Sequence, residues 1–499
     1  MAEHQITNEE AKTNLLASAA FLAETIKSSD GHAAAMREIV PRYLKRDKVD
    51  LSAEFANSVD DPFTRDRLLS LVAEKCAAIN DDEYAFQLVE AIEDFGAKAE
   101  AGEKIAVQKA STGAFEKALE IAGTLPDPDY VFGDVAARQM AKGEEDAAWK
   151  LLAQIDLPNA KIVALQNLAH QYLEAGDSAN AVKMINKAAD FIDEIEMPEE
   201  SVLTMIDIGN HFIEAKENGR AIEIFDRAKA TAETLDSQQR DLFLARIALG
   251  FLNAGSLDLA DRALDLVADS AQMAWTLLGY SRHFQAQNEP DEAAEILEEA
   301  YAILKSQKDR DVRDSRFRFN LWANIAAEFA QIRKNERAVE IAQEITDEAS
   351  QISALSTIAQ ICALQDKDEL ARQSVNAIGD DAPRLFALLG ISDAKIKTGK
   401  REEALNFLRE AETLSETVPQ LASRSDALNE LAKRFQDLGD ATKARELLHE
   451  NLELISTIRD ESSRAVALAH LSDFYERLNY ELNDAEREIL DALVRKVGG

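Results

Sequence analysis

The chain has 499 residues, of which 46% are hydrophobic and 30% charged, and only nine prolines and nineteen glycines interrupt it. This length exceeds what one globular core usually supports, so it indicates several domains or a repeat stack whose core grows with length. Its 56 Lys and Arg against 92 Asp and Glu give a formal charge of −36, which argues against nucleic-acid binding and favours cationic partners.

The N-terminal stretch from Asn8 to Lys27 predicts a single helix with Thr7 or Asn8 as its N-cap. It has no clear hairpin partner, so we expect residues 1–30 to form a capping helix over the apolar face of the first repeat. The apolar run from Leu15 to Ala23 lacks a basic flank and is too short to span a bilayer. We therefore expect a cytoplasmic protein without membrane insertion.

The stretch from Ile162 to Ile192 predicts two amphipathic helices joined by a turn at Gly176. Apolar residues recur there at three- and four-residue steps, first at Leu165, Leu168, Ala169 and Tyr172 and then at Ala181, Ile185 and Ala188. This pattern is typical of a helical hairpin, and variants of it fill most of the chain.

A small residue early in each second helix, here called the marker alanine, aligns the repeats. The marker alanines are Ala53, Ala85, Ala118, Ala148, Ala181, Ala221, Ala260, Ala293, Ala338, Ala371, Ala404, Ala444 and Ala485. Their spacings cluster near 33 and near 40 residues. We expect the extra residues of the longer units to add one turn to each facing helix and to form a raised rim. No linker divides residues 31–499, so one continuous stack is predicted.

The first helices carry a shared stripe at fixed distances before the marker alanine. Twelve residues before it stand small residues, namely Ala169, Gly209, Ala248, Ser281, Ala326, Ala359, Ser392 and Ala432. Nine residues before it stand mostly aromatic residues, namely Tyr172, Phe212, Phe251, Phe284, Phe329 and Phe435, with Cys362 and Lys395 in two units. Small residues permit close helix approach, while large ones fill the space between hairpins.

This pattern resembles the tetratricopeptide repeat (TPR), on the set Leu165, Leu168, Ala169, Tyr172, Ala181 and Ile185 and similar sets along the chain. It departs from the family in lacking the regular proline at the repeat end and in having units of about 40 residues. The resemblance implies an all-α fold, a right-handed α-solenoid of about a dozen stacked hairpins that binds proteins or peptides.

Prolines and glycines support these boundaries. Six prolines fall between a second helix and the next first helix: Pro126, Pro128, Pro158, Pro198, Pro383 and Pro419. Six glycines fall in hairpin turns and are expected to be helix C-caps: Gly113, Gly143, Gly176, Gly255, Gly399 and Gly439.

The resemblance also implies an inner groove lined by first helices. The positions that it places there are Gln166, His170, Asn210, Arg282, Gln285, Gln360, Asp393, Asn429 and Lys433. Only Asn429 and Lys433 are similar to the family's carboxylate-clamp residues, so a groove of mixed character is favoured over a clamp.

The segment Lys305–Arg318 is a basic exception in an acidic chain. Its candidate rim residues are Arg310, Arg313, Arg316 and Arg318. It can be a solvated, internally paired segment or a ridge that docks an acidic partner or a second subunit.

Enzyme chemistry finds little support in the sequence. The histidines lack ligand spacing, and the adjacent acids at Asp60–Asp61, Asp81–Asp82 and Asp380–Asp381 suit N-caps better than a metal site. Cys76 and Cys362 are expected to be buried free thiols. We therefore expect no metal, no cofactor and no catalytic residue.

The predicted function is a non-enzymatic scaffold or adaptor that holds protein partners, with basic partners favoured by the charge and a homo-oligomer compatible with the sequence. The alternatives are an assembly chaperone or a structural subunit of a larger complex and, from another class, an α/α-toroid enzyme.

Overall fold

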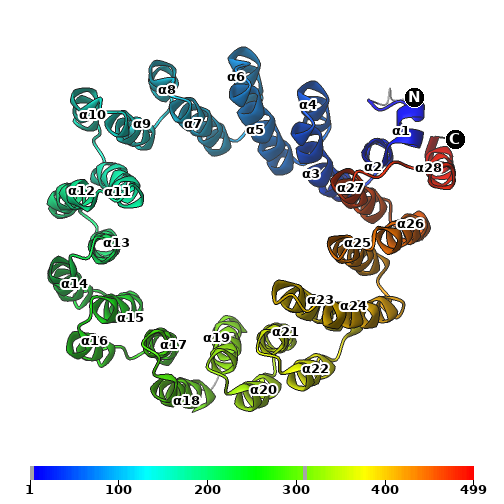
Figure 1. Cartoon of the computed structure of the whole chain (residues 1–499). Helices are drawn as coiled ribbons and strands as arrows, with labels where there is room; N and C mark the ends of the chain where they lie inside the picture. The colour runs from blue at the N-terminus through cyan, green and yellow to red at the C-terminus, as the bar shows by residue number, and fades with distance from the viewer. Residues whose placement is uncertain (1–4, 307–311, 499) are drawn as a thin grey trace. The chain divides into compact units, whose positions relative to one another are not determined.

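The computed structural model describes residues 5–306 and 312–498, and these form helices with no strand in the described ranges. They pair into antiparallel hairpins, and Figure 1 shows the hairpins following one another in chain order. The first helices are α3 (Ser29–Lys45), α5 (Pro62–Ala78), α7 (Phe95–Ser111), α9 (Asp129–Ala141), α11 (Pro158–Glu174), α13 (Pro198–Glu214), α15 (Ser237–Asn253), α17 (Ser270–Ala286), α19 (Val312–Gln331), α21 (Glu348–Leu364), α23 (Asp381–Lys397), α25 (Leu421–Asp437) and α27 (Glu461–Arg477).

The second helices complete these hairpins. They are α4 (Val49–Asn57), α6 (Asp82–Glu90), α8 (Phe115–Ala122), α10 (Glu145–Leu152), α12 (Ser178–Asp190), α14 (Asn218–Ala232), α16 (Leu257–Leu264), α18 (Pro290–Ser306), α20 (Asn335–Glu344), α22 (Asp368–Asn376), α24 (Arg401–Ser415) and α26 (Ala441–Thr457). A short 3₁₀ helix, η1 (Ile192–Glu194), follows α12. Three further helices lie at the chain ends: α1 (Asn8–Thr13), α2 (Leu15–Ala23) and α28 (Asp484–Gly498).

The chain forms two compact units. Unit 1 contains residues 1–108 and 362–499, and unit 2 contains residues 109–361. Each unit is an all-α stack of hairpins, as the sequence predicts. The boundary of 1–30 as a capping segment and the continuity of the stack over 31–499 stay predictions.

The hairpin turns share one backbone conformation. One residue near the start of the turn has a positive φ, and in the described chain thirteen such residues occur, all five or six positions before a marker alanine. Gly176, at φ 78°, lets Asp177 donate its backbone N–H to the carbonyl of Tyr172 at 2.8 Å. This satisfies a carbonyl at the helix end and fixes the turn. The six predicted glycine C-caps are confirmed.

Most of the longer repeats extend the second helix, so the predicted sharing of extra turns between both helices is wrong for them, whereas in the longest unit the first helix α19 is also longer, with 20 residues. In the described chain, eleven first helices have 17 residues each, in short and long units alike. By contrast, α8, α10 and α16 have 8 residues, whereas α18 and α26 have 17. First helices pack against neighbours before and after them in the stack, so their length is constrained.

Buried aspartates fix the loops after three of the short second helices. Asp66, Asp129 and Asp241 stand nineteen positions before their marker alanines and are at most 7% exposed. The carboxylate of Asp241 accepts the backbone N–H groups of Ala268 and Asp269 at 2.9 and 2.7 Å. Asp129 accepts those of Asp156 and Leu157 at 2.9 and 2.8 Å. The aspartate therefore satisfies the loop that leads into the next repeat.

The core lies where helices approach at small residues. All marker alanines from Ala53 to Ala444 are at most 1% exposed. On α14, Phe225 is fully buried, and a Cβ placed on Gly209 of α13 or Gly250 of α15 would lie 2.5 or 2.6 Å from its ring. The glycines therefore make room for the ring that joins two repeats. Ala485 is exposed, so its assignment as a marker alanine is wrong.

The N-terminal stretch contains two helices, so the predicted single helix from Asn8 to Lys27 is also wrong. Thr7 caps α1 in a capping box with Glu10. Asn14 is extended, at φ −141° and ψ 126°, and its side chain accepts the N–H of Ala17 to start α2. All nine residues of α2 are buried. The chain thus turns at Asn14, and a helix whose residues are all apolar except Ser18 enters the interior of unit 1.

Two further predictions concern the cysteines and membrane insertion. Both cysteines, Cys76 and Cys362, are buried, as predicted. In the described chain, no helix is long and apolar enough to cross a membrane.

We expect Ala181→Leu and Ala404→Leu each to lower the free energy of unfolding by about 1–3 kcal/mol, because neither buried site has room for the added carbons. Chemical denaturation measures the change. The matched control is Ala485→Leu at an exposed site, which should stay within about 0.5 kcal/mol of the parent. Equal losses for all three variants would contradict the repeat register.

We expect Asp129→Ala to lower the free energy of unfolding by about 1–3 kcal/mol, because two backbone N–H groups lose their acceptor. Glu223→Ala, at an exposed site on α14, is the control and should change stability by less than about 0.5 kcal/mol. If Asp129→Ala and Glu223→Ala have the same free energy of unfolding, the two backbone N–H groups do not depend on Asp129 as their acceptor.

Candidate protein-binding surface

Unit 2 carries a row of exposed apolar residues, one on each of five successive first helices. Its members stand eighteen positions before the marker alanine: Tyr130 on α9, Val163 on α11, Leu203 on α13, Leu242 on α15 and Trp275 on α17. The first four are between 37% and 45% exposed, and Trp275 is half-buried. Because successive first helices pack against one another, the same position on each places these side chains in a line.

The repeat register explains why this position faces outward. The buried residue Leu165 of α11 stands two positions after Val163, which is about 200° around a helix. One turn further along the exposed side follow Asp134, Asn167, Asp207 and Arg246, which are polar. We call the apolar row and this polar row together the first-helix face. Partial burial raises the pKa of Asp207, against the opposing charges of His211 and Arg246.

Several predicted groove residues lie on the same helices of unit 2. Gln166 and His170 follow Val163 by three and seven positions, and Asn210 follows Leu203 by seven, so each shares a side with the apolar row. Arg282 follows Trp275 by seven positions and forms an ion pair with Glu328 of α19 at 2.6 Å. Gln285 is half-buried and Gln360 is exposed.

The remaining predicted groove residues lie in unit 1. Asp393 pairs with Arg434 at 2.7 Å, and Lys433 lies 3.9 Å from Glu430. Asn429 is only 1% exposed, and its side-chain oxygen accepts a hydrogen bond from the buried Asn451 at 2.8 Å. Asn429 therefore cannot contact a ligand in a groove, and its assignment as a groove residue is wrong. In the sequence, a polar residue in the core and a polar residue in a groove look alike, because both kinds of position recur at helical spacing.

The predicted rim falls largely outside what the structure describes. Arg310 lies outside the described residues, as does the side chain of Arg313. Arg316 is exposed, whereas the guanidinium of Arg318 lies over the ring of Phe319, 4.6 Å from its centroid. Arg318 is thus packed against aromatic residues at the start of α19. The rim as a binding surface stays a prediction.

An acidic edge adjoins the first-helix face at the start of α13. It contains Asp190, Asp193, Glu194, Glu196, Glu199 and Glu200, and all but the half-buried Glu199 are exposed. Met197, at the N-cap of α13, is 55% exposed among them. Apolar and acidic groups therefore alternate at this edge.

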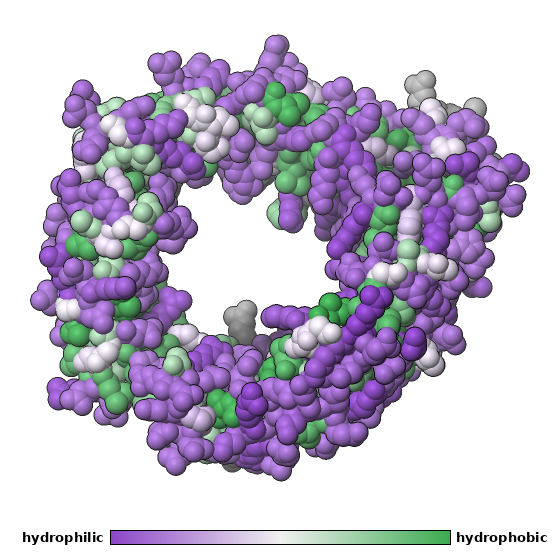
Figure 2. All heavy atoms as spheres, in the orientation of Figure 1, coloured by the Kyte–Doolittle hydropathy of each residue, from purple (hydrophilic) through white to green (hydrophobic). Residues whose placement is uncertain are grey.

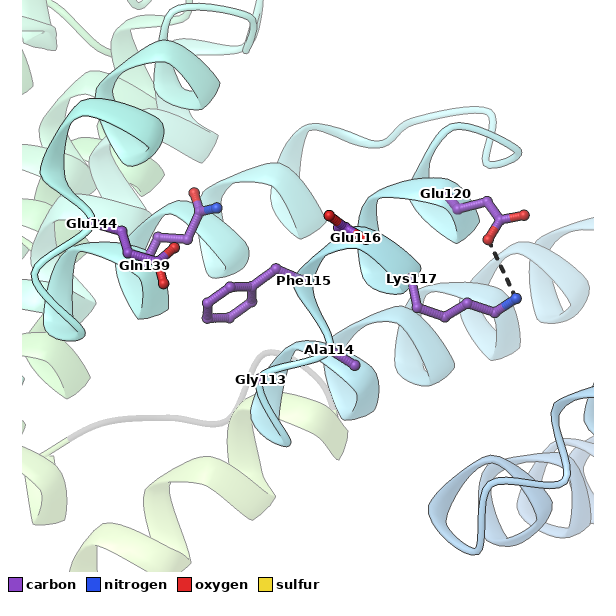
Figure 3. Close-up of a pocket in the computed structure, with 8 residues that line it drawn as sticks. All are labelled: Gly113, Ala114, Phe115, Glu116, Lys117, Glu120, Gln139 and Glu144. Carbon is purple, nitrogen blue, oxygen red and sulfur yellow. Dashed lines mark ion pairs between the residues drawn. The ribbon is translucent and has the colours of Figure 1, made fainter.

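The surface also contains a pocket between α8 and α9, lined by Gly113, Ala114, Phe115, Glu116, Lys117, Glu120, Gln139 and Glu144 (Figure 3). Lys117 pairs with Glu120 at 3.3 Å, and Lys142 lies 4.7 Å from the centroid of the Phe115 ring. Lys117 and Lys142 thus have partners at the pocket, whereas the side-chain oxygen of Gln139 is buried without a hydrogen-bond partner among the described residues. The pocket does not gather the groups that an enzyme site needs.

One buried charged cluster serves the core of unit 1. Lys395 occupies the position that is aromatic in most repeats, its side chain is inaccessible, and it contacts Asp368 at 2.6 Å, Glu403 at 2.9 Å and Asp366 at 3.3 Å. Burial acts to lower the pKa of Lys395, but its hydrogen bonds with Asp368, Glu403 and Asp366 outweigh burial and raise it. The cluster replaces ring packing by ion pairs that join α22, α23 and α24.

Acids predicted to be N-caps behave accordingly. Asp61 accepts the N–H of Thr64 at 2.9 Å, and Asp81 that of Tyr84 at 3.3 Å. Asp380 is the N-cap of α23 by backbone position, without a side-chain cap bond. Among the described residues, no group of three or more His, Cys, Asp or Glu side chains is arranged to hold a metal ion.

The sequence prediction missed the apolar row. Its signal is a large apolar residue eighteen positions before the marker alanine in five successive units, on the side of the helix opposite the core stripe. Figure 2 shows that most of the visible surface is hydrophilic and that hydrophobic residues form separate patches on it.

No family model and no curated protein matches this chain. Solved structures that match the chain include Ton1535 from Thermococcus onnurineus NA1, with 19% identity, a TM-score of 0.26 and coverage of 71% of this chain and 98% of that one. TPR-like repeats from Podosopora anserina give 18% identity, a TM-score of 0.21 and coverage of 53% and 99%. The APC/C heterotetramer Cut9–Hcn1 gives 12% identity, a TM-score of 0.22 and coverage of 93% and 95%.

Similarities at this level carry no functional argument. What the hairpins, their turns and their packing show is the fold: each unit is an all-α stack of helical hairpins whose repeats resemble the TPR.

Proposed function

We propose that the protein is a non-enzymatic scaffold whose first-helix face in unit 2 holds a segment of a protein partner. The observation that carries the proposal is the apolar row, which exposes one large apolar side chain on each of five successive helices. Exposed apolar groups arranged contiguously and flanked by polar ones mark interaction surfaces.

The acidic edge sets the chemistry of the partner. Acids outnumber bases around Met197 and Leu203, and the whole chain carries a formal charge of −36. A segment with apolar side chains and a net positive charge would complement both features. Such a partner would place its apolar side chains on the row and its cationic groups near Glu199 and Glu200.

The experiment compares pull-downs with the parent and with Val163→Glu/Leu203→Glu, each analysed by mass spectrometry, and then measures affinity for the recombinant partner. We expect the double variant to bind about tenfold or more weakly, because buried apolar anchors carry most of the binding energy of an interface. The matched control, Leu257→Glu, changes an equally exposed leucine on the second helix α16. Equal affinity of both variants for the partner would refute this surface.

We expect Glu199→Lys/Glu200→Lys to slow association with a basic partner and to reduce the salt dependence of binding, because acids near the site attract the partner over about a Debye length. Stopped-flow kinetics at low and high salt measures both effects. The control is Glu223→Lys on α14, and Arg316→Glu probes the predicted rim. An association rate that does not change with salt for the parent would show that charge does not guide the encounter.

A further inference from the structure

The two ends of the chain meet inside unit 1. The first helix of the last hairpin, α27, packs along α2, and it also packs against α3 in the way that neighbouring first helices pack elsewhere. Figure 1 shows α2 next to α27 and α3, with α28 beyond it. An N-terminal helix thus occupies the place beside α27 where a second helix is expected.

The helix that follows α27 in sequence does not take this place. Helix α28 packs against α1, α2 and α26. Its Ala485 is exposed, whereas the marker alanines of the second helices are buried. Tyr475 of α27 reaches only the start of α28, where its hydroxyl donates to Glu486 at 2.8 Å.

The residues of α2 fit the register of a second helix. Ala17 and Phe21 stand four positions apart, as do the marker alanine Ala221 and the buried Phe225 of α14. Phe21 is 1% exposed, and the spacing from Ala17 to Ala53 lies within the range seen along the chain. A helix that is buried on all sides needs partners around it, and α27, α3, α1 and α28 supply them.

Polar contacts also join the two ends of the chain where α27 meets α3 and where α28 meets α1. We call this contact region the seam. Arg42 of α3 pairs with Asp473 of α27 at 2.9 Å, and Ser462 of α27 donates its hydroxyl to the carbonyl of Gly31 at 2.9 Å. Lys12 of α1 pairs with Asp491 of α28 at 3.1 Å. Arg46 pairs with Glu476. Side chains from four helices therefore join residues more than 400 positions apart.

A histidine lies in the same seam. His470 of α27 contacts Glu38 of α3 at 3.2 Å and Asp426 of α25 at 3.4 Å. The interaction with Asp426 raises the pKa of His470, against burial and the charge of Arg42. The first repeat and the last two repeats thus share one electrostatic network.

We propose that α27 and α3 form a helix-binding site whose ligand is the chain's own segment 8–23. In this arrangement α2 is the second helix of the last hairpin. Unit 1 is then one continuous stack in which the last repeat leads directly into the first. Segment 8–23 covers both the final and the initial apolar face, and its role exceeds that of a cap on the first repeat alone.

The geometry at Gly31 provides a direct test in the full-length protein. A Cβ on Gly31 would lie 3.4 Å from the Cβ of Ser462, close to the separation of about 3.5–4.5 Å found in disulfides. We expect Gly31→Cys/Ser462→Cys to form a disulfide within one chain, seen as faster migration on a non-reducing gel and as an unchanged monomer mass in solution. The control pair, Gly31→Cys/Ser463→Cys, should cross-link much more slowly.

The role of α2 is tested by adding substitutions to the cysteine pair. Phe21→Asp should slow disulfide formation by about tenfold or more, because α2 can no longer bury its ring position. Phe21→Ala should slow disulfide formation less. It replaces Phe21→Asp as the test variant if Phe21→Asp does not fold. Lys27→Asp, at an exposed site, should leave the rate unchanged.

Two outcomes would overturn the proposal. A disulfide-linked dimer would show that α2 and α3 pack on α27 of a second copy. Cross-linking at the parent rate in the Phe21 variants would show that α2 does not hold the chain ends together.

Discussion

The stack depends on the close approach of helices at small side chains. Where Phe225 enters between Gly209 and Gly250, the two first helices α13 and α15 leave room for one ring and no more. The buried marker alanines allow a similarly close approach between first and second helices. A hairpin of two helices cannot bury both of its apolar sides alone, so each repeat is stable only with neighbours on either side. Any repeat without a neighbour must be covered.

This requirement explains how the lengths are distributed. Inside a unit, first helices such as α11, α13 and α15 touch the first helices before and after them, so a change in their length would disturb two interfaces. A second helix can extend past its neighbours and expose the added turn. After some of the short second helices, the following loop donates backbone hydrogen bonds to a buried aspartate. These aspartates are Asp66, Asp129 and Asp241. Repeat length therefore varies where packing allows it.

The same requirement connects the ends of unit 1 to the scaffold function that we propose. With α2 beside α27, the terminal repeats expose no apolar end face at the seam. Exposed apolar residues are then left for binding, as on the first-helix face of unit 2. In the proposed complex the acidic edge would limit the choice of partner by charge, while the apolar row would provide contact area.

The sequence by itself determined the repeat unit. Alternation of small and large residues at helical spacing predicts the hairpins, and the glycines at the turns predict their C-caps, because these are local requirements of helix geometry. It also placed His170, Asn210 and Arg282 on the exposed side of their helices. Only the tertiary structure decided which long-range partner completes each surface. Asn429 looks like a groove residue until Asn451 is seen beside it in the core. Ala485 fits the repeat spacing, yet α2 occupies the place beside α27, because a helix with eight apolar residues of nine gains more from burial than the charged α28 does.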